Sequence, residues 1–375
     1  MTQRTEYPEL VATSRIGGRE LLTPTAVAPM TRVSAGEHGR ATDRMARYYA
    51  DFARGGFGLV VTEGIYTDHR YSQAYPAQPG LADDEQAAAW RPVVDAVHAE
   101  GGTIVAQLMH AGALSQALET TIAPSAVAPK GRRMPDYGGG DGPFPMPSAA
   151  SADDIRDAVA GFAAAARRAR DAGFDGVEVH GANGYLLDQF LTDYTNRRTD
   201  GYGGAATGRA RIAAEVLAAI RAEVGPDVVV GIRISQAKVN DAHHRWSEPD
   251  AREILAVIAA ERPDYVHVAG EGADWASAAA VGTTTLTRLA RAIVGVPVIA
   301  NGSLHDPAAA QKLLVDGEAD LVAIGRGAIV NPDWPARVRD GRPLRAWERG
   351  ILSPRADLAT QDAWFAAHAG EDGAA

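Results

Sequence analysis

The sequence predicts an α/β protein, a single (β/α)8 TIM barrel over residues 1–375, because apolar runs and helical segments alternate about eight times along it. The runs are rich in Val and Ile and have the length of buried strands, and alanine-rich segments of helical period follow them. An open, doubly wound sheet is the alternative, which the absence of an early Gly-x-Gly-x-x-Gly disfavours. The expected strands are residues 25–31, 59–65, 103–109, 176–180, 228–235, 265–269, 296–301 and 321–325.

Helix-start signals support the helical half of this pattern. Ser151, Ser247 and Asp306 each precede acidic residues or a proline, which is typical of an N-cap followed by a first helical turn. We therefore expect helices over residues 84–100, 152–172, 207–224, 249–260, 307–316 and 332–340.

Three segments fall outside the alternation. Residues 1–23 precede the first strand, and a hairpin around Gly17-Gly18 is expected there, covering the floor of the barrel. Residues 113–150 are rich in Pro and Gly and follow the third strand, so we expect a functional loop or lid over the catalytic end. Residues 366–375 are expected to form a frayed tail.

Charge and composition limit the possible functions. Acidic side chains outnumber basic ones by 47 to 37, whereas a nucleic-acid-binding protein needs a basic face. The absence of cysteine excludes disulfides, iron–sulfur clusters and thiolate metal sites. No carboxylate–histidine cluster indicates a metal, and His243-His244 is interpreted as surface loop. Without a signal peptide or a long apolar span, we expect a cytoplasmic protein that binds neither nucleic acid nor membrane.

The stretch from His180 to Gly204 is the strongest functional signal. His180, Asn183 and Tyr185 follow directly where an apolar run ends, and barrels carry their chemistry at the carboxyl ends of strands. A single histidine there would more often be structural, so the prediction depends on the combination. Two hydrogen-bond donors beside a phenol suit a reaction that polarises a carbonyl and then delivers a proton.

Other strand ends carry groups that suit a flat heterocycle with a phosphate tail. Gln107 offers a donor and an acceptor that match an imide edge. Thr31 offers a hydroxyl to a ring carbonyl, and Arg233 could neutralise an anion on the ring. Glycine-rich turns after the last two predicted strands could bind a phosphate through backbone N–H groups, assisted by Arg326.

These motifs resemble the Old Yellow Enzyme family of FMN-dependent NAD(P)H oxidoreductases. The matching segments follow the order of the family and cover most of the chain. They are Ala28-Pro-Met-Thr31, Tyr48–Gly56, Val61–Gly64, Gln107–Gly112, His180–Gly204, Arg233–Ser235 and Gly325-Arg326.

The resemblance implies a flavin enzyme that reduces the C=C bond of a small electron-poor alkene, either an α,β-unsaturated carbonyl or a nitro compound. FMN would be its cofactor and NADPH or NADH its reductant, and family members are commonly monomers or dimers. His180 and Asn183 would bind the oxygen of the activating group. Tyr185 would donate the proton, and Tyr75 would line the substrate pocket. The residues implied in FMN binding are Pro29, Met30, Thr31, Gly64, Gln107, Arg233, Gly302, Ser303, Gly325 and Arg326.

The sequence departs from the family at several positions, which leaves the pocket shape and the substrate range open. Met109 stands where many relatives carry Trp, Ala or Ser, and Ala113 replaces a common Arg. Gln236 stands where Pro is frequent, and residues 327–331 replace a more usual Arg-Pro-Phe run.

Two other functions are compatible with the same fold. One is a flavin-dependent dehydrogenase or isomerase, which loss of the phenol would favour, whereas Tyr185 is present. The other is a barrel that only binds a phosphorylated ligand, and the intact donors at His180 and Asn183 count against it.

Overall fold

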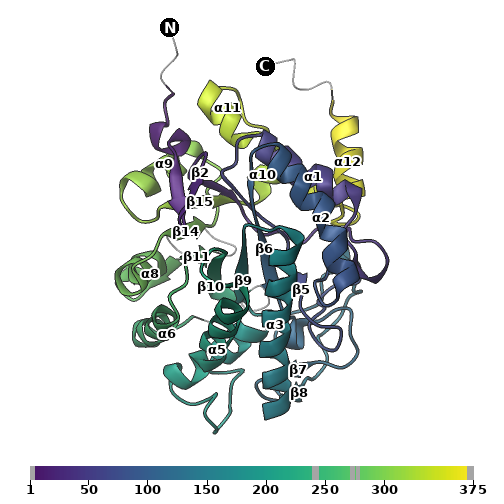
Figure 1. Cartoon of the computed structure of the whole chain (residues 1–375), viewed down its shortest axis with the longest axis vertical. Coiled ribbons are helices and arrows are strands. Elements are labelled where there is room, and N and C mark those ends of the chain that lie inside the picture. Colours follow the sequence, from purple (N-terminus) through teal and green to yellow (C-terminus); the bar gives the residue numbers. More distant parts are fainter. Residues whose placement is uncertain (1–4, 239–244, 271–274, 276–278, 370–375) are drawn as a thin grey trace.

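The core of the protein is a closed barrel of eight parallel strands (Figure 1). The computed structural model describes residues 5–238, 245–270, 275 and 279–369. Neighbouring strands pair in parallel around the ring, and the last strand returns to pair with the first. The predicted (β/α)8 barrel is therefore confirmed. Its strands are β3 (Thr25–Val27), β4 (Leu59–Val61), β6 (Thr103–Met109), β9 (Gly176–Asn183), β10 (Val229–Lys238), β11 (Tyr265–Ala269), β14 (Val298–Asn301) and β15 (Leu321–Ile324).

Helices surround the strands, and α3, α5, α6 and α8 pack side by side in chain order (Figure 1). Each of the six predicted segments forms a helix, and among the main helices of the barrel α1 and α8 occur in addition. The main helices of the barrel are α1 (Asp43–Arg54), α2 (Asp84–Ala99), α3 (Ala152–Ala172), α5 (Ala206–Val224), α6 (Glu248–Ala260), α8 (Leu286–Val294), α9 (Pro307–Val315) and α11 (Trp334–Asp340).

Helix α3 has the predicted bounds because its end signals are local. Ser151 and Asp154 form a reciprocal capping box at its start, and Gly173 ends it in a left-handed conformation with φ +98°. The buried residues Ile155 and Phe162 are spaced by two helical turns and face the core.

The floor of the barrel is closed by the predicted hairpin. Strands β1 (Ser14–Ile16) and β2 (Arg19–Leu21) pair antiparallel. Ile16 and Leu21 pack against inward-facing residues of the barrel strands, including Val105. Since this end is filled with apolar side chains, a ligand site can form only at the opposite, carboxyl end of the strands.

Three strands end earlier than predicted, β15 by a single residue, and two continue further. β3 ends at Val27 rather than at residue 31, because Pro29 has no N–H to donate to the ladder. β4 ends at Val61, and the chain pairs again only as β5 (Ile65–Tyr66). β9 and β10 extend beyond the apolar runs, and a register shift separates Ile234 from Lys238. The polar residues at these ends therefore leave or distort the sheet.

Shorter elements complete the chain. The tail predicted over residues 366–375 begins later than expected, because Ala366 and Ala367 are the last two residues of the C-terminal helix. Residues 370–375 and the His243-His244 pair, which was predicted as a surface loop, lie outside the described residues. In the described part of the chain, no helix has the length and apolarity needed to cross a bilayer. The shorter elements are η1 (Pro8–Val11), η2 (Glu37–Gly39), η3 (Gly112–Leu114), β7 (Ile122–Ala123), η4 (Pro135–Tyr137), β8 (Ser148–Ala149), α4 (Leu186–Leu191), β12 (Ala280–Val281), β13 (Thr284–Thr285), α10 (Arg326–Val330), η5 (Arg349–Leu352) and α12 (Leu358–Ala367).

Candidate active site

A cavity of about 430 Å³ lies at the carboxyl ends of the barrel strands. Every residue that the sequence predicts for the site lines this one cavity. The barrel brings them together because its parallel strands all end at the same face. They are Pro29, Met30, Thr31, Gly64, Tyr75, Gln107, His180, Asn183, Tyr185, Arg233, Gly302, Ser303, Gly325 and Arg326.

His180, Asn183 and Tyr185 lie at the end of β9 and on the turn that follows. Each is almost completely buried, with exposed fractions of 4%, 5% and 6%. The chain turns sharply because Asn183 and Gly184 adopt left-handed angles, φ +62° and +86°, and α4 starts directly after Tyr185. The imidazole, the amide and the phenol thereby reach the same cavity.

Arg233 on β10 orients the side-chain amide of Asn183. Its Nη1 donates to Asn183 Oδ1 at 2.7 Å, and its Nη2 donates to Asn301 Oδ1 at 3.0 Å. Because the amide oxygen faces Arg233, the Nδ2 donor of Asn183 faces the other way. The guanidinium links the ends of β9 and β14 and places a positive charge in the cavity wall.

Glu178 on β9 orients Gln107 in a similar way. Its Oε1 accepts from Gln107 Nε2 at 2.8 Å, so the Gln107 amide presents its oxygen to the cavity. The other carboxylate oxygen contacts Tyr265 Oη at 3.0 Å and His267 Nδ1 at 2.9 Å. Burial raises the pKa of Glu178, but His267, Arg233 and Gln107 outweigh burial, and the net shift of this pKa is downward.

His180 is held as a neutral imidazole. Burial lowers its pKa well below the usual value, and the charges of Arg233 and His267 lower it further. Its Nδ1 is buried and has no hydrogen-bond partner among the described residues, although buried polar atoms are normally paired. An unpartnered nitrogen at a cavity wall indicates a site that a polar ligand completes.

Tyr75 contacts Tyr185 at the cavity wall. The two hydroxyl oxygens lie 2.7 Å apart. Burial raises the pKa of Tyr75 well above its usual value, and the adjacent Tyr185 raises it further, so Tyr75 remains a protonated donor. The ring of Tyr137, from the 113–150 segment, lies 5.2 Å from that of Tyr75 between centroids. The long segment therefore contributes to the cavity wall.

The other end of the cavity is formed by backbone after β14 and β15. Gly302 has a φ of +147°, and a Cβ there would lie 3.0 Å from the carbonyl oxygen of Gly270. Ser303 is also left-handed, with φ +51°, and Gly325 is the residue before helix α10. Glycine-rich turns of this kind direct backbone N–H groups toward an anion such as a phosphate. Arg326 is exposed at the edge of this end.

Some residues of the site were missed by sequence reasoning. Glu178 lies two residues before His180, so both side chains point to the same face of β9, and a carboxylate inside an apolar run was the available signal. Met134 and Tyr137 come from the 113–150 segment and Leu352 from the C-terminal region. No local pattern marks these three, because only the folded chain brings them to the barrel mouth.

The fold and the site define a barrel enzyme that binds a flat, phosphorylated cofactor, and comparison with known proteins identifies its family. Residues 14–345 match the NADH:flavin oxidoreductase / NADH oxidase family. The chain is 33% identical over 365 residues to a flavin oxidoreductase of Emericella nidulans, covering 90% of this chain and 92% of the relative. It is 35% identical over 346 residues to a probable flavin mononucleotide-dependent alkene reductase of Leishmania infantum, covering 88% and 90%.

A solved structure agrees with this assignment. The Old Yellow Enzyme homologue of Zymomonas mobilis superposes with a TM-score of 0.84 at 29% sequence identity, covering 94% of this chain and 99% of that one. The chain therefore belongs to the NADH:flavin oxidoreductase / NADH oxidase family, which includes the Old Yellow Enzymes. It is an FMN-dependent NAD(P)H oxidoreductase.

Proposed function

We propose that the enzyme reduces the C=C bond of α,β-unsaturated carbonyl or nitro compounds, using NADPH or NADH as the source of electrons. The observation that carries this proposal is the turn after β9. It presents two hydrogen-bond donors, His180 and Asn183, and one phenol, Tyr185, to a single cavity. This set matches a reaction in which charge develops on a conjugated oxygen and a proton is then delivered to carbon.

The cavity has the groups that FMN requires. The Gln107 oxygen and the Arg233 guanidinium would hold the pyrimidine edge of the ring, and Thr31 would contact a ring carbonyl. The glycine-lined far end, where a Cβ at Gly302 would approach the Gly270 backbone, fits the phosphate tail. When bound, FMN supplies the hydride that the β-carbon of the alkene receives. The remaining proposed contacts come from Pro29, Met30, Gly64, Gly302, Ser303, Gly325 and Arg326.

His180 and Asn183 would bind the carbonyl or nitro oxygen of the substrate. Asn183 is suited to donate because Arg233 takes its amide oxygen. His180 is neutral, so one ring nitrogen carries a proton that it can donate without bringing a full charge. Donors aimed at an oxygen on which charge develops are worth about 3 kcal/mol each in comparable sites.

Tyr185 would donate the proton to the α-carbon. Its hydroxyl is buried at the cavity wall and lies 2.7 Å from the hydroxyl of Tyr75. Because Tyr75 remains protonated, it can donate a hydrogen bond to the phenolate that Tyr185 becomes after giving up its proton. Tyr75 would thus support proton transfer as well as line the substrate pocket.

The proposal is tested in two half-reactions under anaerobic conditions. Purified protein, reconstituted with FMN, should be yellow and should lose its colour on addition of NADPH or NADH. Addition of 2-cyclohexenone should then restore the colour and yield cyclohexanone. A protein that takes up no FMN, or reduced enzyme that no enone or nitroalkene reoxidises, would contradict the proposal.

A further inference from the structure

The backbone of Gly184 lies between the proposed oxygen-binding amide and the proposed proton donor, and side chains bind both its N–H and its carbonyl oxygen. Its N–H donates to Asp188 Oδ2 at 2.7 Å, and its carbonyl oxygen accepts from Gln189 Nε2 at 2.7 Å. The preceding N–H, of Asn183, donates to Ser235 Oγ at 2.9 Å. Consecutive residues of the short helix α4 thus fix the turn that precedes it.

Asp188 is part of a buried ion pair. The Lys238 ammonium lies 2.5 Å from Asp188 Oδ1, and the two side chains are 2% and 0% exposed. Lys238 is the last residue of β10 and lies beside Asn183 in the sheet, after the register shift of that strand. It also contacts the Ser235 carbonyl oxygen at 3.3 Å and the Trp246 ring at 5.1 Å.

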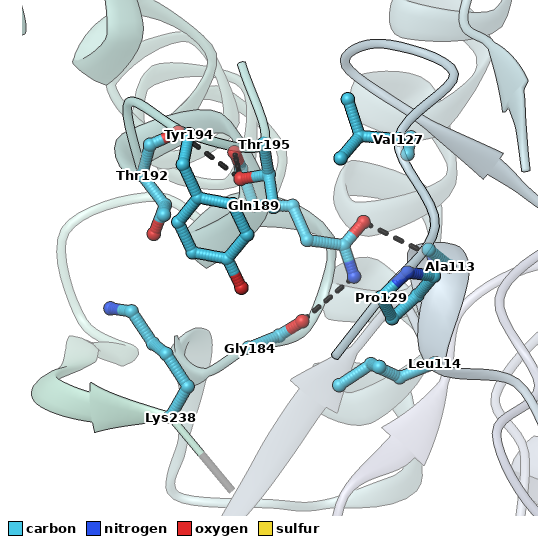
Figure 2. A pocket seen from close by; sticks show the side chains of 11 residues that line it. Ala113, Leu114, Val127, Pro129, Gly184, Gln189, Thr192, Tyr194, Thr195 and Lys238 are labelled. Carbon is cyan, nitrogen blue, oxygen red and sulfur yellow. Dashed lines mark hydrogen bonds between the residues drawn. The ribbon is translucent and has the colours of Figure 1, made fainter. Parts of the chain in front are cut away.

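Gln189 connects the same turn to the neighbouring strand. Figure 2 shows its amide between Gly184 and Ala113. Its Oε1 accepts from Ala113 N at 3.1 Å, and its Nε2 also contacts the Ala111 carbonyl oxygen at 3.3 Å. The Gly184 turn is therefore tied to the chain after β6 on one side and to β10 on the other.

A buried ion pair contributes little to stability compared with apolar residues of similar volume. Asp188 and Lys238 have a geometric effect that an apolar pair would lack. The carboxylate accepts a backbone N–H that the left-handed angles at Asn183 and Gly184 direct inward. Lys238 neutralises the carboxylate and keeps it in place.

We propose that Asp188, supported by Lys238, is a positioning residue for substrate binding, because it fixes the Gly184 N–H and thereby aims Asn183 and Tyr185 into the cavity. Gln189 fixes the carbonyl oxygen of the same residue, in the next peptide group. This inference rests on the proposed function of the turn. Its consequence is that the hydrogen bond to Gly184, and not the buried charge, controls the affinity for the substrate oxygen.

Two double variants separate the hydrogen bond from the charge. D188N/K238Q removes both charges but keeps an acceptor for the Gly184 N–H, whereas D188L/K238M removes both charges and the acceptor. The probe is 4-chlorophenol, whose binding to the oxidised FMN holoenzyme is followed by its charge-transfer absorbance. We expect D188N/K238Q to bind it within about threefold of the wild type, and D188L/K238M about tenfold more weakly.

FMN affinity and thermal stability are measured on the same variants. If Asp188 and Lys238 had only a structural role, the double variants would change FMN affinity or thermal stability but not the affinity for the phenol. The exposed pair of Lys312 on α9 and Asp316, the residue after this helix, provides the control, and K312M/D316L should leave phenol binding unchanged. Equal phenol affinities in the two Asp188 double variants would overturn the inference.

Should D188L/K238M fail to load FMN, Q189M carries the same test, since it removes the donor to the Gly184 carbonyl without changing a charge. About fivefold weaker phenol binding is expected for Q189M, and an unchanged affinity would overturn the inference. A wild-type holoenzyme that binds no phenol would instead overturn the proposed function, and this inference with it.

Discussion

The two ends of the cavity are constructed differently. At the end formed by β6, β9 and β10, buried side chains line the wall, and two of them are oriented by other buried side chains: Glu178 orients Gln107, and Arg233 orients Asn183. At the end formed by the turns after β14 and β15, the backbone of Gly302 and Gly325 lines the wall.

This difference implies that the two ends respond to mutation in different ways. Where side chains carry the chemistry, replacing one functional group removes a specific interaction and leaves its buried neighbour unpaired. Where backbone forms the wall, adding a methyl group should do more harm than removing a side chain, since the site depends on close approach and unusual φ angles. The following predictions test this contrast, in order of expected effect.

The largest effect is expected for Tyr185→Phe. Loss of the proposed general acid should slow the reoxidation of reduced enzyme by 2-cyclohexenone by roughly 100-fold to 10,000-fold. Reduction of FMN by NADPH or NADH requires no proton from Tyr185, so its rate should change far less. Stopped-flow measurement of the two half-reactions checks this, with Tyr202→Phe, a phenol bonded to Glu215 outside the cavity, as the control. Equal losses in both half-reactions would refute the role of Tyr185.

His180→Ala should have the next largest effect. Removal of one donor to the substrate oxygen should weaken 4-chlorophenol binding by roughly 100-fold, which corresponds to the ~3 kcal/mol typical of such donors. Spectrophotometric titration of the holoenzyme measures it. His69→Ala, at an exposed histidine paired with Asp83, is the matched control and should bind the phenol normally. An unchanged affinity in His180→Ala would remove this residue from the oxygen site.

At the glycine-rich end, Gly302→Ala should weaken FMN binding more than Arg326→Ala does. A methyl group at Gly302 would meet the Gly270 carbonyl oxygen at 3.0 Å in a conformation strained for alanine. A cost of about 1–3 kcal/mol corresponds to a loss of roughly fivefold to 150-fold in affinity. Arg326 is exposed, so its loss should cost only about threefold. Titration of apoprotein with FMN gives both values, and a larger loss of FMN affinity for Arg326→Ala than for Gly302→Ala would contradict the dependence of this end on its backbone.

The smallest effect is expected from pH. The pKa of His180 lies well below its usual value, so the imidazole stays neutral and the KM for 2-cyclohexenone should change less than about twofold between pH 8 and 6. A loss of affinity with a midpoint near pH 6.5 would show a normally titrating His180.

The free energy of unfolding, in contrast, should depend on pH through the same residue. Below about pH 6.5 the unfolded chain binds a proton at His180, whereas the buried imidazole of the folded protein stays neutral, so acidification favours unfolding. His180→Ala should lack this contribution in denaturant titrations.

Much of the fold was predictable because its signals are local. β6, β11 and α3 have the predicted bounds, since apolar run length and cap residues mark both of their ends. The end of β3 was predicted too late. The apolar pattern continues past Pro29, whereas the strand itself ends at Val27. Helix α1 was missed although its buried Met45, Tyr49 and Phe52 have helical spacing. Its aromatic residues are equally typical of strands.

The candidate site was predictable as a set of residues but not as an arrangement. Parallel strands in a barrel must end at one face, so any polar residue at a strand end is a candidate, and all those predicted do line the cavity. The roles of Glu178, Asp188 and Lys238 depend on what lies opposite them in space. An ion pair between residues 50 positions apart leaves no local pattern.

The order of the elements and the chemical character of the strand ends follow from the sequence, because periodicity, caps and residue type are properties of short segments. The direction of each functional group does not. Gln107 is oriented by a carboxylate 71 residues away and Asn183 by a guanidinium 50 residues away, while His180 is neutral because the closed barrel buries it beside Arg233. Hydrogen bonds and burial of this kind exist only once the strands have closed into a ring.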